Sequence, residues 1–321
     1  MLLTSMGVMM DKSQRLDVVV VAALMLLVAL VTVPFLGRGG FWFDEIFSVT
    51  TASSWTRLGE VFSRYENNMA LYYVLLHGWM GLGDDEWTVR LLSTLCALAT
   101  LPLLHVLACQ LWNRRVAFIT DILLVTSTLF LHHAMEARAY SLLLFFAVFS
   151  SLLFLQALRR PGWGWWIAYA VVAALSSYAH YFGILMPVAH AMSLAWRERG
   201  TIPWRQVLVS TSVIAVLLIP QALFHPPSMA QLDWLDRPDV QAVVNVGTTF
   251  AGGRSRLLLY GLAMGLTLVF VRRVAAQSSE RSWALWFMIC WLVVPVAAAL
   301  AASLLVKPVF LPKYLIGSLP A

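Results

Sequence analysis

Long apolar runs follow one another along most of the chain, separated by short polar segments. A helix needs roughly 20 apolar residues to cross the ~30 Å hydrocarbon core of a bilayer. The first run, Val18 to Leu36, follows Lys12 and Arg15 and has no small-residue cleavage site after it, so we interpret it as an uncleaved first span. Further runs are centred on residues 90–112, 116–132, 139–158, 163–179, 181–196, 205–223, 256–271 and 283–305. A tenth run begins near Tyr314.

The composition also indicates a membrane protein. Hydrophobic residues make up 60% of the 321-residue chain and charged residues 12%, about half of the roughly 25% that soluble domains carry. A soluble protein could not bury this much apolar surface, and exposing it would cause aggregation. The sequence therefore predicts an all-α, polytopic transmembrane protein with about nine complete spans and the start of a tenth, in one domain over residues 1–321.

Basic residues stand in pairs between the apolar runs. Lys and Arg accumulate in cytoplasmic loops, so these pairs predict that the N-terminus lies in the cytoplasm. We expect the chain to be a multi-pass protein of the cytoplasmic membrane. The acidic residues then gather in two outer segments, residues 37–86 and 224–254. The net charge of +6 is thus explained by the orientation of the chain in the membrane, and it indicates no nucleic-acid partner. The basic pairs are Arg114–Arg115, Arg159–Arg160 and Arg272–Arg273.

The first outer segment predicts amphipathic helices in the membrane interface. Ser53 and Ser54 can cap a short helix whose apolar side chains share one face. Met69 to Leu82 is apolar but too short to span, so we expect it to be interfacial or re-entrant. The shared face of the first helix comprises Trp55, Leu58, Val61 and Phe62.

Adjacent carboxylates stand just beyond the first span, in the stretch FWFDEIFS. Partial desolvation of Asp44 or Glu45 at this apolar boundary would make a better base near neutral pH. The alternative is a helix N-cap at Asp44 followed by a first-turn Glu45, solvated at the membrane surface.

A second group lies in HHAMEARAYSL, after the third run. On a continuous helix His132, Glu136 and Tyr140 would share a face, with Arg138 pointing elsewhere. An arginine at a lipid boundary suits a phosphate, which it can bind with two hydrogen bonds. The alternatives are an ion pair between Glu136 and Arg138, or an Arg138 side chain that extends to the membrane interface.

Metal binding stays open at this group. His132, His133 and Glu136 could ligate a divalent ion together with Asp44 or Glu45. The spacing matches no zinc motif, so we assign no metal ligand and keep a divalent metal ion as a possible cofactor.

Two further pairs are weaker candidates. His180 and Tyr181 stand in a short outer turn where they could face a cavity, although a lone histidine is more often structural. Lys313 and Tyr314 stand at the outer start of the last run, where either phosphate binding or membrane anchoring fits. The sequence contains no nucleotide-binding or nucleophile-elbow motif, so a reaction at the outer face needs a substrate that arrives through the membrane.

Taken in order, these stretches resemble the C-type superfamily of membrane glycosyltransferases, in particular the protein-mannosyltransferase and aminoarabinose-transferase group with its Rgt-like members. Each stretch is modest alone, but the ordered set is specific and runs from about residue 41 to the end. The matching stretches are FWFDEIFS, NNMALYYVLLHGW, GLGDDEWTVRLLSTL, MEARAYSL, SSYAHYFGIL and LPKYLIGSLP.

The resemblance implies an enzyme that transfers a sugar, hexose or pentose, from a polyprenyl-phosphate donor to a lipid, glycan or protein acceptor on the outer face, with inversion. By this resemblance Asp44 acts as base or acceptor anchor, with Glu45 beside it. The second motif, which contributes to substrate binding, comprises Glu136, Arg138 and Tyr140. The third comprises His180 and Tyr181.

The chain departs from the family pattern at two places. Asn68-Met69-Ala70 stands where many members have His-Pro-Pro, and Lys313 stands where an arginine usually precedes the tyrosine. Lysine keeps the charge but loses the two-point geometry. The chain also ends inside the last motif, from which we expect a truncated form of a longer protein.

The chemistry agrees with the resemblance. A polyprenyl phosphate is a good leaving group, so the site needs a carboxylate for the acceptor proton and cations for the phosphate. Asp44 supplies the first, and Arg138 and Lys313 supply the second. The alternative is a lipid or glycan transporter or flippase, which would carry charges near the membrane midplane and inverted repeats with broken helices.

Overall fold

The computed structural model describes residues 11–160, 162–223, 235–275 and 278–321, with the side chains of residue 264 and residues 267–275 excepted. All regular elements in these ranges are helices. Residues 224–234, which begin the expected second outer segment, lie outside the described part, as do the side chains of Arg272 and Arg273. The all-α prediction is confirmed.

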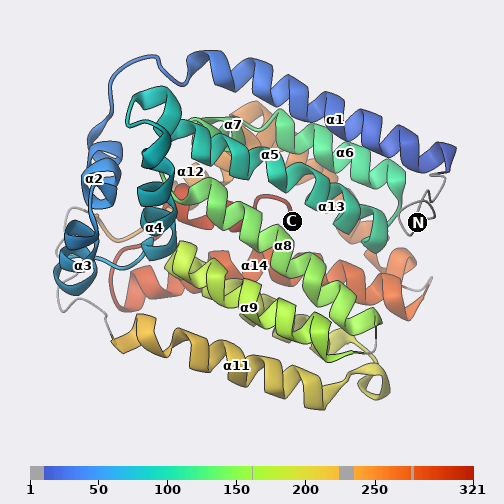
Figure 1. The fold of residues 1–321 in the computed structure, drawn as a ribbon. Coiled ribbons are helices and arrows are strands. Elements are labelled where there is room, and N and C mark those ends of the chain that lie inside the picture. The colour runs from blue at the N-terminus through green and yellow to red at the C-terminus, as the bar shows by residue number, and fades with distance from the viewer. Residues whose placement is uncertain (1–10, 161, 224–234, 276–277) are drawn as a thin grey trace, which may run out of the picture.

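The long helices run roughly along one direction and pack around α8 (Tyr140–Arg159) (Figure 1). Helix α8 lies against α5 (Glu86–Leu111) and α9 (Trp163–Ala179), and most of its residues are buried. The outer long helices are α1 (Lys12–Thr32), α11 (Trp204–Leu223), α13 (Arg254–Ala275) and α14 (Ser279–Leu305).

Each of the nine apolar runs contains helix, but their lengths differ. By length and composition, five helices of the described part are able to cross a membrane, or six if one bent pair counts as a span. That pair is α6 (Arg114–Val125) and α7 (Thr128–Ala134), bent by 62°. The run at 181–196 divides into η3 (Tyr181–Ile184), α10 (Leu185–Ser193) and η4 (Leu194–Trp196).

The second candidate motif is not helical, which corrects the expectation that His132, Glu136 and Tyr140 share a helix face. Helix α7 ends at Ala134 and α8 begins at Tyr140. Distant groups bond the backbone between them: the Glu45 carboxylate accepts from Ala137 N at 2.8 Å, and Thr94 Oγ1 donates to Ala134 O at 2.7 Å. These hydrogen bonds replace backbone hydrogen bonds that a continuous helix would have made between α7 and α8.

The first outer segment forms the short helices that its pattern predicts. They are α2 (Phe43–Ala52), α3 (Trp55–Arg64) and α4 (Ala70–Trp79), followed by η2 (Met80–Leu82). Ser54 caps α3 by accepting from Arg57 N, while Ser53 ends α2. Leu58 and Val61 are buried, whereas Trp55 is 67% exposed. The three helices gather at one end of the bundle (Figure 1).

The segment expected to begin a tenth span is the 3-10 helix η7 (Pro312–Ser318). It packs against α8, α14 and α12 (Val240–Ala251). Trp291 Nε1 donates to Gly317 O at 2.7 Å, which ties η7 to α14. This packing carries Lys313 to the same end of the bundle as α2.

Candidate functional site

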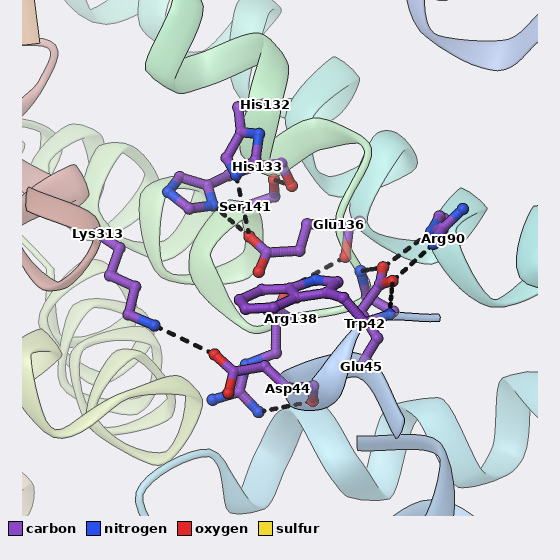
Figure 2. A network of polar contacts seen from close by, with 12 residues as sticks. Trp42, Asp44, Glu45, Arg90, His132, His133, Glu136, Arg138, Ser141 and Lys313 are labelled. Atoms are coloured by element: carbon purple, nitrogen blue, oxygen red, sulfur yellow. Dashed lines mark hydrogen bonds and ion pairs between the residues drawn. The ribbon is translucent and has the colours of Figure 1, made fainter. Parts of the chain in front are cut away.

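Three segments that are distant in sequence meet at the α2 end of the bundle (Figure 2). They are the first turn of α2 with Asp44, the turn at 135–139 with Arg138, and η7 with Lys313. Lys313 Nζ lies 3.1 Å from Asp44 Oδ2, and Arg138 Nη1 donates to Asp44 O at 3.2 Å. The structure thus brings together the residues that the sequence selected as base and phosphate ligands, whose roles stay predictions.

Asp44 is the accessible acid of the pair in FWFDEIFS. Trp42 holds the N-cap position of α2, so Asp44 stands in the first turn and does not cap the helix, unlike in the alternative interpretation. Its side chain is 24% exposed, and Lys313 is the only partner found for its carboxylate in the described part of the chain. A carboxylate with a free face and one movable cation is able to accept a proton from a ligand.

Glu45 has a different environment, although it is the next residue. Its side chain is 1% exposed, and Arg90 binds it through Nε at 2.8 Å and Nη2 at 2.6 Å. With the bond from Ala137 N, both carboxylate oxygens are occupied. Glu45 therefore fastens α2 to α5 and to the turn that carries Arg138.

Arg90 is a residue that the sequence analysis did not select. Besides Glu45 it donates to the carbonyls of Leu36 and Gly40, at 2.6 and 3.1 Å, in the loop before α2. These bonds hold the loop that places Asp44. The sequence could have indicated Arg90, because it is an arginine one turn into a largely apolar helix, and ionised groups within membrane helices usually have a partner.

Arg138 is 7% exposed, which excludes a side chain extending to the interface. Its Nη1 lies 3.3 Å from Ser48 Oγ and 3.4 Å from Tyr73 Oη, and Tyr73 in turn donates to Glu66 at 2.5 Å. The described residues include no ion pair between Arg138 and Glu136. Burial disfavours the charged form, yet neighbouring Tyr73 and other groups hold the Arg138 pKa well above its usual value, so the guanidinium stays charged.

Lys313 is surrounded by aromatic rings. Its Nζ lies 5.9 Å from the ring centroid of Trp42, 5.7 Å from that of Tyr140 and 5.9 Å from that of Tyr314. Ring faces attract an ammonium without neutralising it. Burial raises the pKa of Tyr314, so this ring is a neutral phenol. The Lys313 side chain is 25% exposed and thus remains available to an anion.

His180 and Asn68 close the other side of the site. Burial, helped by the charges of Arg138 and Lys313, lowers the pKa of His180 to about 3, so its ring is neutral. Asn68 Nδ2 lies 3.2 Å from His180 Nε2, and its Oδ1 accepts from Tyr181 N at 2.9 Å. The residue that departs from the family's His-Pro-Pro run therefore contacts the third motif directly.

Glu136 stands at the edge of this site with the two preceding histidines (Figure 2). His133 Nδ1 lies 2.5 Å from Glu136 Oε2, and His132 Nε2 lies 4.0 Å from the same oxygen. Asp44 and Glu45 bind cations elsewhere and are not part of this group. The sequence placed His132 on one helix face with Glu136, and in the structure His133 is the closer of the two histidines.

Residues 69–225 match the family model of dolichyl-phosphate-mannose-protein mannosyltransferases. The resemblance seen in the sequence is confirmed. No curated protein matches the chain.

Two solved structures have a similar fold. ArnT from Cupriavidus metallidurans bound to undecaprenyl phosphate aligns with a TM-score of 0.67 at 16% identity, over 94% of this chain and 58% of that one. Its apo state aligns with a TM-score of 0.65 at 16% identity, over 94% and 57%. This chain has the helical membrane fold of ArnT and spans less than two thirds of ArnT's length.

Proposed function

We propose that the chain is a membrane glycosyltransferase that moves a sugar from a polyprenyl-phosphate donor to a hydroxyl of a lipid, glycan or protein acceptor, with inversion. The observation that carries the proposal is the Asp44–Lys313 contact beside buried Arg138. It combines a partly open carboxylate with two cations at one end of a membrane bundle. The mannosyltransferase family match and the ArnT fold, solved with undecaprenyl phosphate, support this donor class.

In the proposed reaction the acceptor oxygen attacks the anomeric carbon of the donor sugar. Asp44 takes the proton of the acceptor hydroxyl as the new C–O bond forms. The bond between the anomeric carbon and the phosphate oxygen breaks, and polyprenyl phosphate leaves with the electron pair. Lys313 and Arg138 stabilise the negative charge that develops on the phosphate. A single displacement inverts the anomeric configuration.

Lys313 has two partners in this scheme. Without donor its ammonium neutralises Asp44. The donor phosphate is a diester with one negative charge, and it competes with Asp44 for the ammonium. The second negative charge develops on the phosphate as the sugar leaves, which strengthens its contact with Lys313 and leaves Asp44 free to act as base. The change from Asp44 to phosphate is possible because Lys313 is held by ring faces and one carboxylate, with part of its side chain exposed.

The remaining site residues have supporting roles in the proposal. Glu45 positions Asp44 and the turn at 135–139, since both its oxygens are occupied. Tyr140 and Tyr314 flank Lys313; Tyr140 is fully buried and supports the ammonium, while partly exposed Tyr314 offers a ring face to the sugar. Neutral His180 has both ring nitrogens engaged, by Asn68 and by Phe182 N, so it positions the third motif. In the proposal, Tyr181 beside it contacts the sugar.

A reconstituted assay tests the donor. Proteoliposomes that contain the chain and a radiolabelled polyprenyl-phosphate sugar, with no nucleotide sugar, are supplied with membrane lipids and glycans as acceptors. We expect a new glycosidic bond, detected as label in a product that survives the mild acid that releases the sugar from polyprenyl phosphate. Label that merely changes leaflet would favour the flippase alternative, and transfer that requires a nucleotide sugar would refute the donor assignment.

Comparison of cells with and without the gene identifies sugar and acceptor. Mass spectrometry of envelope glycolipids, glycans and glycoproteins should reveal one product class that loses a hexose or a pentose. Loss from all classes together would indicate an earlier step, such as donor synthesis.

We place the site on the outer face of the cytoplasmic membrane. Single cysteines at Asp44 and at exposed His132 should react with an impermeant thiol reagent in intact cells, and those at Arg114 and Arg159 only after lysis, in a background without native cysteines. Labelling of the arginine positions in intact cells would reverse the topology.

A further inference from the structure

Among the carboxylates in or beside the site, those of Asp44, Glu45 and Glu136 differ in what balances their charge. Asp44 contacts Lys313, and Glu45 contacts Arg90. Within the described residues, Glu136 contacts neither a lysine nor an arginine, although its side chain is only 5% exposed. Burying a carboxylate without a cation is costly, so Glu136 is a buried acid that lacks a fixed positive partner.

The partners that Glu136 does have are imidazoles. The nitrogen and oxygen ligand atoms of His132, His133 and Glu136 all lie within 4.8 Å of one another. The three residues come from the last turn of α7 and from the break that follows it. Of the two histidines, His133 is the closer to Glu136, with Nδ1 at 2.5 Å from Oε2.

Two of these ligands are held in place before anything binds. Ser141 Oγ donates to the carbonyl of His133 at 2.8 Å, and the His133 ring packs on Tyr140 with centroids 4.6 Å apart. The bond from Ala137 N to Glu45 fixes the backbone next to Glu136. His132 is the third ligand, and its side chain is 69% exposed, so it is free to move toward an ion.

We propose that His132, His133 and Glu136 bind a divalent transition-metal ion of the zinc type. Two imidazoles and one carboxylate are a ligand set for zinc, manganese, cobalt or nickel, whereas magnesium and calcium prefer oxygen ligands. The ion balances the buried Glu136 carboxylate. Three protein ligands leave a fourth tetrahedral position for water on the side of exposed His132.

Asp44 and Glu45 are not ligands in this proposal. Each carboxylate is already engaged, by Lys313 and by Arg90 respectively. Metal binding therefore does not depend on the proposed transfer reaction and is measured without donor or acceptor.

The test uses the full chain purified with a tag that contains no histidine, stripped with EDTA and freed of chelator. Zinc chloride is titrated by isothermal calorimetry, and bound metal per chain is measured by plasma mass spectrometry after gel filtration. We expect one zinc ion per wild-type chain. His132→Ala should weaken binding at least about 10-fold, since loss of even an outer-shell partner costs roughly 10- to 100-fold.

Two controls separate metal loss from misfolding. His132 is exposed, so His132→Ala should keep the melting temperature of the metal-free protein. Glu136→Gln, which removes the carboxylate charge, should also weaken zinc binding; if this variant fails to fold, His132→Ala decides the question. Glu60→Gln, which neutralises an acid on α3, and Asp44→Asn should both keep wild-type zinc affinity. Absence of stoichiometric zinc in the wild type, or unchanged affinity in His132→Ala, would overturn the proposal and leave only a His133–Glu136 hydrogen bond.

Discussion

Two polar clusters lie at opposite ends of the helical bundle, one at the α2 end and one near the start of α1 (Figure 1). The second, here called the α1–α5–α6 clamp, comprises Asp17, His105, Arg114 and Asp121. Arg114 Nη2 lies 2.7 Å from Asp17, and His105 Nδ1 lies 2.6 Å from Asp121. Both clusters place charges among apolar helices, but they are built differently.

The clamp pairs its members with one another, across three helices that are in contact anyway. In the site, Asp44 and Lys313 are partners although they are 269 residues apart in sequence, and both side chains keep about a quarter of their surface exposed. Within the part of the chain that the structure describes, Arg138 is engaged by a backbone carbonyl, a hydroxyl and a phenol and by no carboxylate. Charges that satisfy each other hold helices together, whereas charges with weak or movable partners remain available to a ligand.

The largest loss of transfer activity is expected from a substitution of Asp44. Asp44→Asn keeps shape and hydrogen-bonding capacity but removes basicity, which is typically worth about 10²–10⁴ in rate. The turnover assay, normalised to folded protein, should fall by that factor while membrane yield stays near normal. Retention of more than about half of the activity would remove Asp44 from the chemistry.

The next largest effect is expected on donor affinity when Arg138 is changed. Arg138→Lys keeps the charge but cannot present two parallel donors to a phosphate. A hydrogen bond to a charged group contributes about 1.5–3 kcal/mol, so the donor affinity should fall about 10- to 100-fold. Titration with the polyprenyl-phosphate sugar, in the absence of acceptor, measures it. An unchanged affinity would mean that Arg138 only supports the fold, as the clamp does.

Glu45→Gln tests whether part of the site is itself a clamp. The amide oxygen can still accept from Ala137 N, but the charge opposite Arg90 is lost. Because breaking a buried pair costs about 3–5 kcal/mol, the melting temperature should fall clearly. Turnover per folded molecule should fall less than in Asp44→Asn. Equal loss of turnover in the two variants would assign chemistry to Glu45 as well.

The smallest effect on transfer is expected in the clamp. Asp121→Asn removes the partner of His105 and should lower the stability by about 1–3 kcal/mol, measured as thermal unfolding in detergent. Turnover per folded molecule should stay at the wild-type level. The double variant His105→Leu/Asp121→Leu should regain stability, since replacing a buried pair by apolar side chains is often neutral or stabilising. A loss of turnover in this folded double variant would link the clamp to function.

The sequence predicted much of this arrangement. The apolar runs marked the helices because a span must satisfy its own backbone in lipid. The capped helix after Ser54 followed from a local pattern. Asp44, Arg138 and Lys313 were selected as ionisable residues at apolar boundaries, and the structure brings them together. The length of the spans was less predictable, because the bend between α6 and α7 has no proline or glycine to signal it.

By itself, the sequence determined that the chain is a helical membrane protein with acids and cations near the ends of its helices. These properties depend on composition and on spacing within one helix, which are local. Only the tertiary structure decided that Glu45 binds Arg90 while Asp44 stays open, and that Glu136 meets His133. The break at 135–139 is held by bonds from Glu45 and Thr94, which come from distant parts of the chain. Their energy exists only once the helices have packed, so no local pattern reports it.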